Sequence, residues 1–362
     1  MARYFYMIVF LNMFVHIIFN VPLILIQHRF NGAVTSMAIS IVIGSILSYI
    51  FIKAISKYPY NGLPEIFMDL LPGYIRIPFL LFLSLMWIAA GSLAIGSFAY
   101  LVKLYVNPEM DLKIILGFLV LVLIYGSTRG TQSIIYKTGF SVLTASPFIA
   151  FIIYKALTSD YFYPVHIKRV LQYSWEMPNY SSVAAASYMF TGYINLVIMN
   201  RNIQAKRILK HFWLIPVLGT LILVFTYLIP FGFLGIKSIG DFVFPWMVTV
   251  DTLRMEYGFI ERTSFLLVMI FMILSILFGI ITWNVGLELM KGAFGIEDRK
   301  TGKRLFPLVF LGIVGFLTVY FQETLNQRSY FEAAKIWFNL RLPVEILLVL
   351  ALSLLPLRRK QA

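Results

Sequence analysis

Three polar side chains recur at every fourth position of an otherwise apolar N-terminal segment, residues 4–26: Asn12, His16 and Asn20. Steps of four residues advance about 40° around an α-helix, so the three side chains face nearly the same way. The two amides can form hydrogen bonds, and His16 can form hydrogen bonds or transfer a proton near neutral pH. A polar face is costly in lipid, which predicts that it lines a cavity or another helix.

Two predicted interruptions add candidate binding groups. Pro22 follows Asn20 by two residues, lacks a backbone donor and clashes with the preceding turn, so the first helix is predicted to break there. Thr191-Gly192 is predicted to interrupt the sixth apolar segment, since glycine weakens a helix by about 1 kcal/mol relative to alanine. We expect ligand contacts at both breaks and at polar positions of the third and eighth segments: Phe19, Asn20, Val21, Pro22, Ser92, Thr191, Gly192, Tyr193 and Asn284.

Ionisable residues inside apolar segments are functional candidates by default. His16 and Glu288 are candidates for a proton or polar relay. The alternative for His16 is a hydrogen bond to a neighbouring helix, and the alternative for Glu288 is snorkelling to the interface or pairing with Lys291. For Glu345 we expect a structural role, with Arg341 one helical turn earlier as its partner.

The sequence lacks the patterns of catalytic and metal sites. The chain has no cysteine, and its four histidines are scattered, with no pair spaced to bind zinc on one helical turn. The Gly-x-Ser-x-Gly turn of serine hydrolases does not occur. We therefore predict that the protein is not an enzyme and needs no metal or cofactor.

The composition predicts an all-α polytopic membrane protein. Of 362 residues, 60% are hydrophobic and only 13% are charged, about half the charged fraction of soluble proteins. A membrane-spanning helix needs about 20 apolar residues. Ten candidate segments, numbered in chain order, are 4–26, 33–56, 77–105, 112–127, 134–157, 181–199, 212–236, 262–288, 304–322 and 340–357.

The ten segments divide into two halves of five, and segments one and six, which correspond, are both predicted to be broken. Interrupted segments at matching positions are typical of inverted-repeat transporters. We therefore predict one integral membrane domain, residues 1–362, with repeats at about 1–158 and 181–358. Residues 237–261 carry an apolar face at helical spacing, which predicts a surface helix or lid, or else an amphipathic connector.

The net charge of +14 is distributed unevenly. Basic residues are most concentrated in the stretch 201–210 and in the C-terminal Arg358-Arg359-Lys360. The positive-inside rule then places both termini in the cytoplasm. Attraction to anionic membrane lipid accounts for this charge, and no nucleic-acid partner is predicted.

Several short motifs follow the pattern of one family: Asn20-Val21-Pro22, Arg129-Gly130, Tyr163-Pro164-Val165, the stretch 188–193, and Phe244-Pro245 followed by Glu261-Arg262. In these motifs, and in length and helix order over essentially the whole chain, the sequence resembles the B-subunit (GerAB-like) family of bacterial spore-germination receptors. That family belongs to the amino acid/polyamine/organocation transporter superfamily.

The resemblance implies a LeuT-like fold in the inner membrane of a spore. It implies a germinant-sensing subunit that binds a small nutrient, such as an amino acid, between segments one and six and signals to A and C partner subunits. The alternative is a proton-coupled amino acid permease that uses His16 or Glu288 as its proton carrier.

Overall fold

The computed structural model describes residues 2–203, 207–253, 263–296 and 302–359, and in these ranges the chain is helical without β-strands. The predicted motif Glu261-Arg262, part of the basic stretch 201–210, and Lys360 lie outside the described residues. The elements are α1 (Ala2–Val15), α2 (Asn20–Gln27), α3 (Ala33–Ile55), α4 (Leu63–Leu70), α5 (Gly73–Tyr105), α6 (Leu112–Ser127), α7 (Thr131–Leu157), α8 (Pro164–Leu171), α9 (Tyr180–Ser187), the 3₁₀ helix η1 (Tyr188–Asn195), α10 (Leu196–Met199), η3 (Leu209–His211), α11 (Leu214–Leu234), η4 (Ser238–Asp241), α12 (Pro245–Asp251), α13 (Thr263–Phe294), α14 (Gly302–Thr324) and α15 (Gln327–Arg359).

Each of the ten predicted segments coincides with one helix, except that segment one forms the pair α1–α2 and segment six the series α9, η1 and α10. Within the described residues, eight helical spans are long and apolar enough to cross a membrane, and the bent pair α1–α2 makes a ninth. The remaining segment, α6, has 16 residues and is about 24 Å long, shorter than the roughly 30 Å of a bilayer's hydrocarbon core. The protein is therefore a polytopic helical membrane protein.

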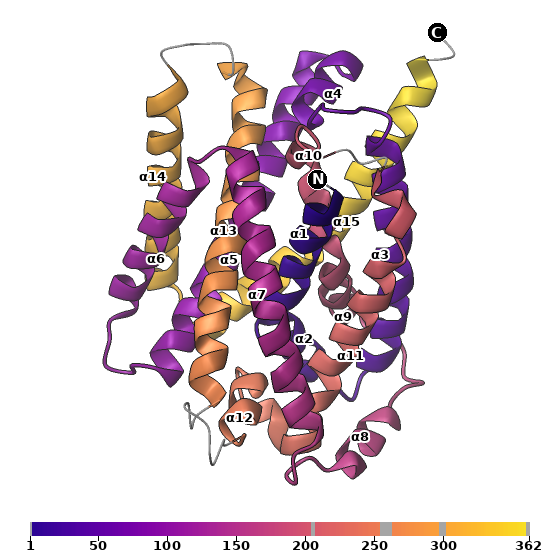
Figure 1. Ribbon diagram of the computed structural model, residues 1–362, viewed down its shortest axis with the longest axis vertical. Helices are drawn as coiled ribbons and strands as arrows, with labels where there is room; N and C mark the ends of the chain where they lie inside the picture. Colours follow the sequence, from indigo (N-terminus) through magenta and orange to yellow (C-terminus); the bar gives the residue numbers. More distant parts are fainter. Residues whose placement is uncertain (1, 204–206, 254–262, 297–301, 360–362) are drawn as a thin grey trace.

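The helices form one bundle with distinct ends (Figure 1). Both chain termini and α4 lie toward one end, whereas α8 and α12 lie at the opposite end. The long helices α5 and α13 pack against each other, and α1 packs against η1. Helices α6 and α14 lie side by side at one edge of the bundle.

Segment one breaks, but one turn earlier than predicted. Helices α1 and α2 meet at 49°, and the break covers residues 16–19. Pro22 lies inside the first turn of α2, where a missing donor is tolerated. In a continuous helix Pro22 would have to bond the carbonyl of Ile18, so the missing bond and the ring clash displace the backbone N-terminal to Pro22.

The α-helix of segment six is interrupted at Thr191-Gly192 as predicted, but by a change of helix type and without a gap in the span. Residues Tyr180–Met199 form one continuous span in which α9 passes into the 3₁₀ helix η1 and then into α10. Thr191 and Asn195 bond backbone carbonyls of the same segment, at 3.3 and 3.1 Å. A β-carbon on Gly192 would lie 2.7 Å from Cα of Val9. Glycine here permits the close approach of η1 to α1.

In the described residues 237–253, most of the apolar face predicted for residues 237–261 is buried against the bundle. It forms the short helix α12 at the end of the bundle, and Trp246 is 2% exposed. The Trp246 indole donates a hydrogen bond to the carbonyl of Thr226 at 2.9 Å. Just before α12, the Phe244 ring packs on Phe19 and Phe331 at 6.4 and 6.0 Å between centroids. Helix α12 therefore covers the break of segment one.

Candidate ligand-binding site

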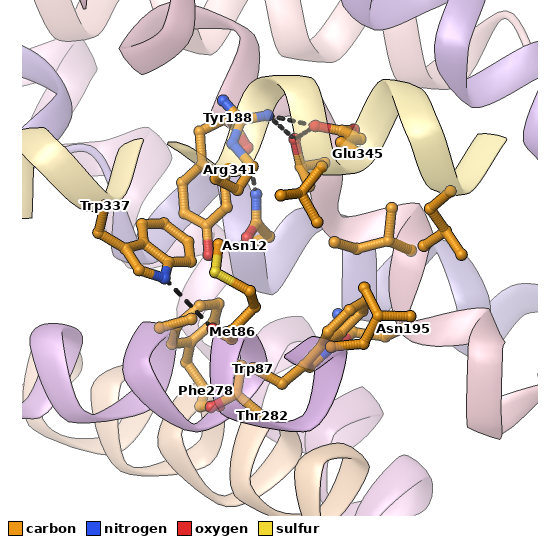
Figure 2. A pocket seen from close by; sticks show the side chains of 16 residues that line it. Asn12, Met86, Trp87, Tyr188, Asn195, Phe278, Thr282, Trp337, Arg341 and Glu345 are labelled. Atoms are coloured by element: carbon orange, nitrogen blue, oxygen red, sulfur yellow. Dashed lines mark hydrogen bonds and ion pairs between the residues drawn. The ribbon is translucent and has the colours of Figure 1, made fainter. Parts of the chain in front are cut away.

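A small cavity lies where α1, α5, η1, α13 and α15 meet (Figure 2). Its polar lining is Asn12, Thr191, Asn195, Thr282, Arg341 and Glu345. Aromatic and apolar walls include Met86, Trp87, Tyr188, Phe278 and Trp337. The cavity has a volume of about 30 Å³. Since one water needs at least about 10–15 Å³ of such space, the cavity holds about two waters, and a larger solute requires the helices to move apart.

A buried ion pair between Arg341 and Glu345, one turn apart on α15, dominates the chemistry of the cavity (Figure 2). Their side chains are 4% and 3% exposed. The Arg341 guanidinium also donates to Thr191 Oγ1 at 3.0 Å, to Ser187 Oγ at 2.9 Å, and to the carbonyl of Ala184. The expected Arg341–Glu345 pairing is confirmed, and the guanidinium binds α15 to α9 and η1.

Glu345 also forms hydrogen bonds with side chains of η1. Its Oε1 accepts a hydrogen bond from the Tyr193 hydroxyl at 2.5 Å, and the Thr191 hydroxyl lies 3.2 Å from Oε2. Two charges taken out of water are tolerated only where geometry and further hydrogen bonds satisfy them. Here the 3₁₀ helix supplies both hydroxyls, so the irregular part of segment six and the charged part of segment ten form one polar network.

Tyr188 connects this network to the break in segment one. The Arg341 Cζ lies 5.0 Å from the centre of the Tyr188 ring, a cation–π distance. The His16 ring lies 4.6 Å from the same ring, and Trp337 packs edge-on at 5.3 Å. The Asn12 amide donates to the Tyr188 carbonyl at 2.7 Å, so Asn12 joins α1 to η1 and also borders the cavity.

His16 lies inside the break, 2% exposed, in a box of aromatic rings. Besides Tyr188, the rings of Phe278 and Phe338 lie 5.2 and 6.3 Å away. Neither ring nitrogen of His16 has a hydrogen-bond partner in the described structure. The Nε of Arg341 is also buried without an acceptor. Buried polar atoms normally have hydrogen-bond partners. The unpaired nitrogens of these two side chains therefore leave hydrogen-bonding capacity unused beside the cavity.

Among the predicted ligand contacts, Thr191 lines the cavity, whereas Tyr193 does not line it but donates a hydrogen bond to the lining residue Glu345. The predicted residues of segment one lie off the cavity: Phe19 packs on Phe244, and Val21 and Pro22 are buried in α2. The Asn20 amide donates to Ser97 Oγ at 3.3 Å, and Gly192 packs against α1.

Ser92, Asn284 and Glu288 lie elsewhere. Ser92 bonds Thr318 at 2.9 Å in a separate apolar groove between α5, α14 and α15. The Asn284 amide donates to the carbonyls of Ser127 and Arg129 at 2.9 and 3.3 Å, which ties α13 to the turn between α6 and α7.

Glu288 belongs to a charged cluster toward the end of the bundle that carries α4. Its carboxylate lies 2.6 Å from Lys291, one of the alternatives expected for this residue, and 2.9 Å from Arg201, which also contacts Glu65 at 2.5 Å. These side chains are 16–29% exposed. The cluster connects α4, the residues after α10, and α13 away from the cavity.

Sequence reasoning did not assign Arg341 and Glu345 to the cavity. The available signal was two opposite charges one turn apart at the start of an apolar segment, a pattern that equally fits a local pair. Only the fold brings this pair on α15 against Thr191 and Tyr193 of η1 and into the cavity that α5 and α13 also line.

The bundle, its broken first span and its buried polar cavity define a multi-pass membrane protein of permease-like architecture. The sequence matches the family model described as "Spore germination protein" over residues 2–328. The chain therefore belongs to the spore germination protein family. No curated protein matches the sequence.

Proposed function

We propose that this chain is the nutrient-sensing subunit of a spore germination receptor, and that a small nutrient, an amino acid, occupies the cavity beside η1. The observation that carries this proposal is the buried Arg341–Glu345 network, which borders both the break at His16 and the 3₁₀ helix. Binding there acts on the two least regular elements of the bundle, so it can shift a conformational equilibrium without covalent chemistry.

We propose that the fold is a five-plus-five inverted repeat. Under this division α5 corresponds to α13, and these helices have 33 and 32 residues. The short helices α4 and α12 also correspond, each has proline in its first turn, and they lie at opposite ends of the bundle. If the second repeat is inverted relative to the first, corresponding helices such as α4 and α12 must lie at opposite ends of the bundle.

The remaining features of the proposal concern location and partners. We place the protein in the inner membrane of the spore with both termini in the cytoplasm, since both lie toward one end of the bundle and basic residues gather there. A and C subunits would read the conformational change of this subunit.

A cavity-filling variant tests the proposal. Ala90 lines the cavity and is 7% exposed, so Ala90→Phe would occupy the space meant for the nutrient. Gly117→Phe is the matched control, because a β-carbon there has no neighbour within 4 Å. We expect Ala90→Phe spores to lose the nutrient response that depends on this chain, while Gly117→Phe spores respond normally.

Both variants must reach wild-type levels in the spore membrane, measured by immunoblot. If Ala90→Phe does not accumulate, Thr191→Val tests the same cavity from η1 with little change in volume. A normal concentration dependence in the cavity variants would refute the proposed site. Concentrative, proton-driven amino acid uptake by the purified chain in proteoliposomes would instead support the permease.

A further inference from the structure

We infer that the cavity selects a zwitterion of zero net charge, whose carboxylate binds Arg341 and whose ammonium binds Glu345. The inference rests on the proposed function, because it assumes that the nutrient occupies this cavity. It assigns specificity to segment ten, whereas the sequence directed attention to the breaks of segments one and six.

Charge balance is the first step. Arg341 and Glu345 are the charged side chains among the residues that line the cavity, and together they are neutral. A cation or an anion entering this space would leave one uncompensated charge in a low-dielectric interior, which is strongly unfavourable. A zwitterion adds one charge of each sign and preserves neutrality.

The second step is the hydrogen-bonding capacity of the pair. Arg341 Nε is buried without an acceptor, so a carboxylate placed across Nε and one terminal nitrogen would form the bidentate contact that guanidinium favours. The Glu345 oxygens accept from Tyr193, Thr191 and Arg341, which leaves about one of their four lone-pair sites for an ammonium group, and a second is released when the ligand carboxylate takes the place of Glu345 on Arg341. The ligand can therefore enter between the two side chains while the hydroxyls of η1 keep their partners.

The third step is the character of the other walls. Three polar residues away from the ion pair already form hydrogen bonds. The Asn12 amide donates to the Tyr188 carbonyl, and the Asn195 oxygen accepts from the Trp87 indole at 3.0 Å. Thr282 donates to a carbonyl of its own helix. A sugar or nucleoside would bury many hydroxyl groups with few hydrogen-bond partners, which is unfavourable. The aromatic walls instead fit an apolar side chain of the ligand.

Spores distinguish these ligand classes directly. The probes are glycine, L-valine and L-leucine, the methyl ester and N-acetyl form of each, glucose and inosine, and the readout is the germination response that is lost on deletion of this chain. We expect a response to at least one zwitterion and about 100-fold weaker potency of its ester and N-acetyl forms, since each loses one charge-assisted contact. A chain-dependent response to an ester, an N-acetyl form, glucose or inosine at equal potency would overturn the inference.

A paired substitution tests the two residues. Arg341→Met with Glu345→Leu replaces the ion pair by apolar groups of similar size, a change that proteins often tolerate. We expect normal accumulation and loss of the zwitterion response. The control is Lys113→Met with Glu323→Leu, an exposed pair 2.6 Å apart, which should respond normally.

If the paired variant does not accumulate, Arg341→Lys keeps the charge but loses the planar fork, and it should weaken the response about tenfold. An unchanged response in the paired variant, or in Arg341→Lys when the paired variant does not accumulate, would overturn the inference. Failure of the proposed function looks different: deletion spores would respond to every probe as wild type does, or Ala90→Phe would leave the response intact.

Discussion

Replacing Gly192 by alanine should destabilise the protein, whereas the same replacement at Gly117, the matched control, should not. In the structure, a β-carbon at Gly192 would lie 2.7 Å from Cα of Val9, 3.0 Å from Cβ of Asn12 and 3.3 Å from the Ile8 carbonyl oxygen. Two of these neighbours are backbone atoms, so Gly192→Ala must push η1 and α1 apart. At Gly117 a β-carbon meets nothing within 4 Å.

The expected magnitudes follow from these distances. Overpacking a buried contact costs about 1–3 kcal/mol, and replacing glycine by alanine in a helix returns about 1 kcal/mol. Gly192→Ala should therefore lower the free energy of unfolding by up to about 2 kcal/mol, whereas Gly117→Ala should raise it by up to about 1 kcal/mol.

The assay is thermal unfolding of the two purified variants in one detergent, followed by tryptophan fluorescence. We expect Gly192→Ala to unfold below wild type and Gly117→Ala at or above it. If Gly192→Ala proves as stable as Gly117→Ala, then η1 and α1 are not close-packed, and their close approach does not explain the glycine in segment six.

Two further predictions concern ionisable residues. Glu288→Gln should lower the free energy of unfolding by about 1–2 kcal/mol, and less at high salt, because it weakens the partly exposed contacts to Arg201 and Lys291; an equal loss at low and high salt would contradict this. His16→Phe should leave the unfolding temperature unchanged or raise it, because the imidazole nitrogens have no partner and the surroundings are aromatic; a marked decrease would show that His16 forms a stabilising hydrogen bond.

Apolar segments could be predicted from the sequence because membrane insertion imposes a long, continuous signal on each one. All ten appear as helices, although α15 begins thirteen residues before the predicted start of segment ten at residue 340. The extra residues include polar ones that the hydropathy pattern excludes, such as Arg328, Ser329 and Glu332, and these three are exposed.

The positions of the helix interruptions and of the cavity residues were harder to predict from the sequence. Pro22 predicted a break, but the backbone is displaced one turn before it. Gly192 predicted an interruption, which takes the form of a 3₁₀ stretch, and its lack of a side chain permits contact with Val9. The cavity joins residues more than 300 positions apart, such as Asn12 and Arg341. Such contacts depend on how helices cross, which one sequence does not encode in any short pattern.

The length of η1 has a mechanical consequence. A 3₁₀ helix rises about 2.0 Å per residue with three residues per turn, against about 1.5 Å and 3.6 in an α-helix. Rewinding all eight residues of η1 into α-helix would shorten the segment by about 4 Å and turn its far end by about 160°. Arg201, six residues beyond η1, would be withdrawn from Glu65 and Glu288. Such a rewinding would therefore change the length of segment six between the cavity and the charged end of the bundle by about 4 Å, less than one turn of α-helix.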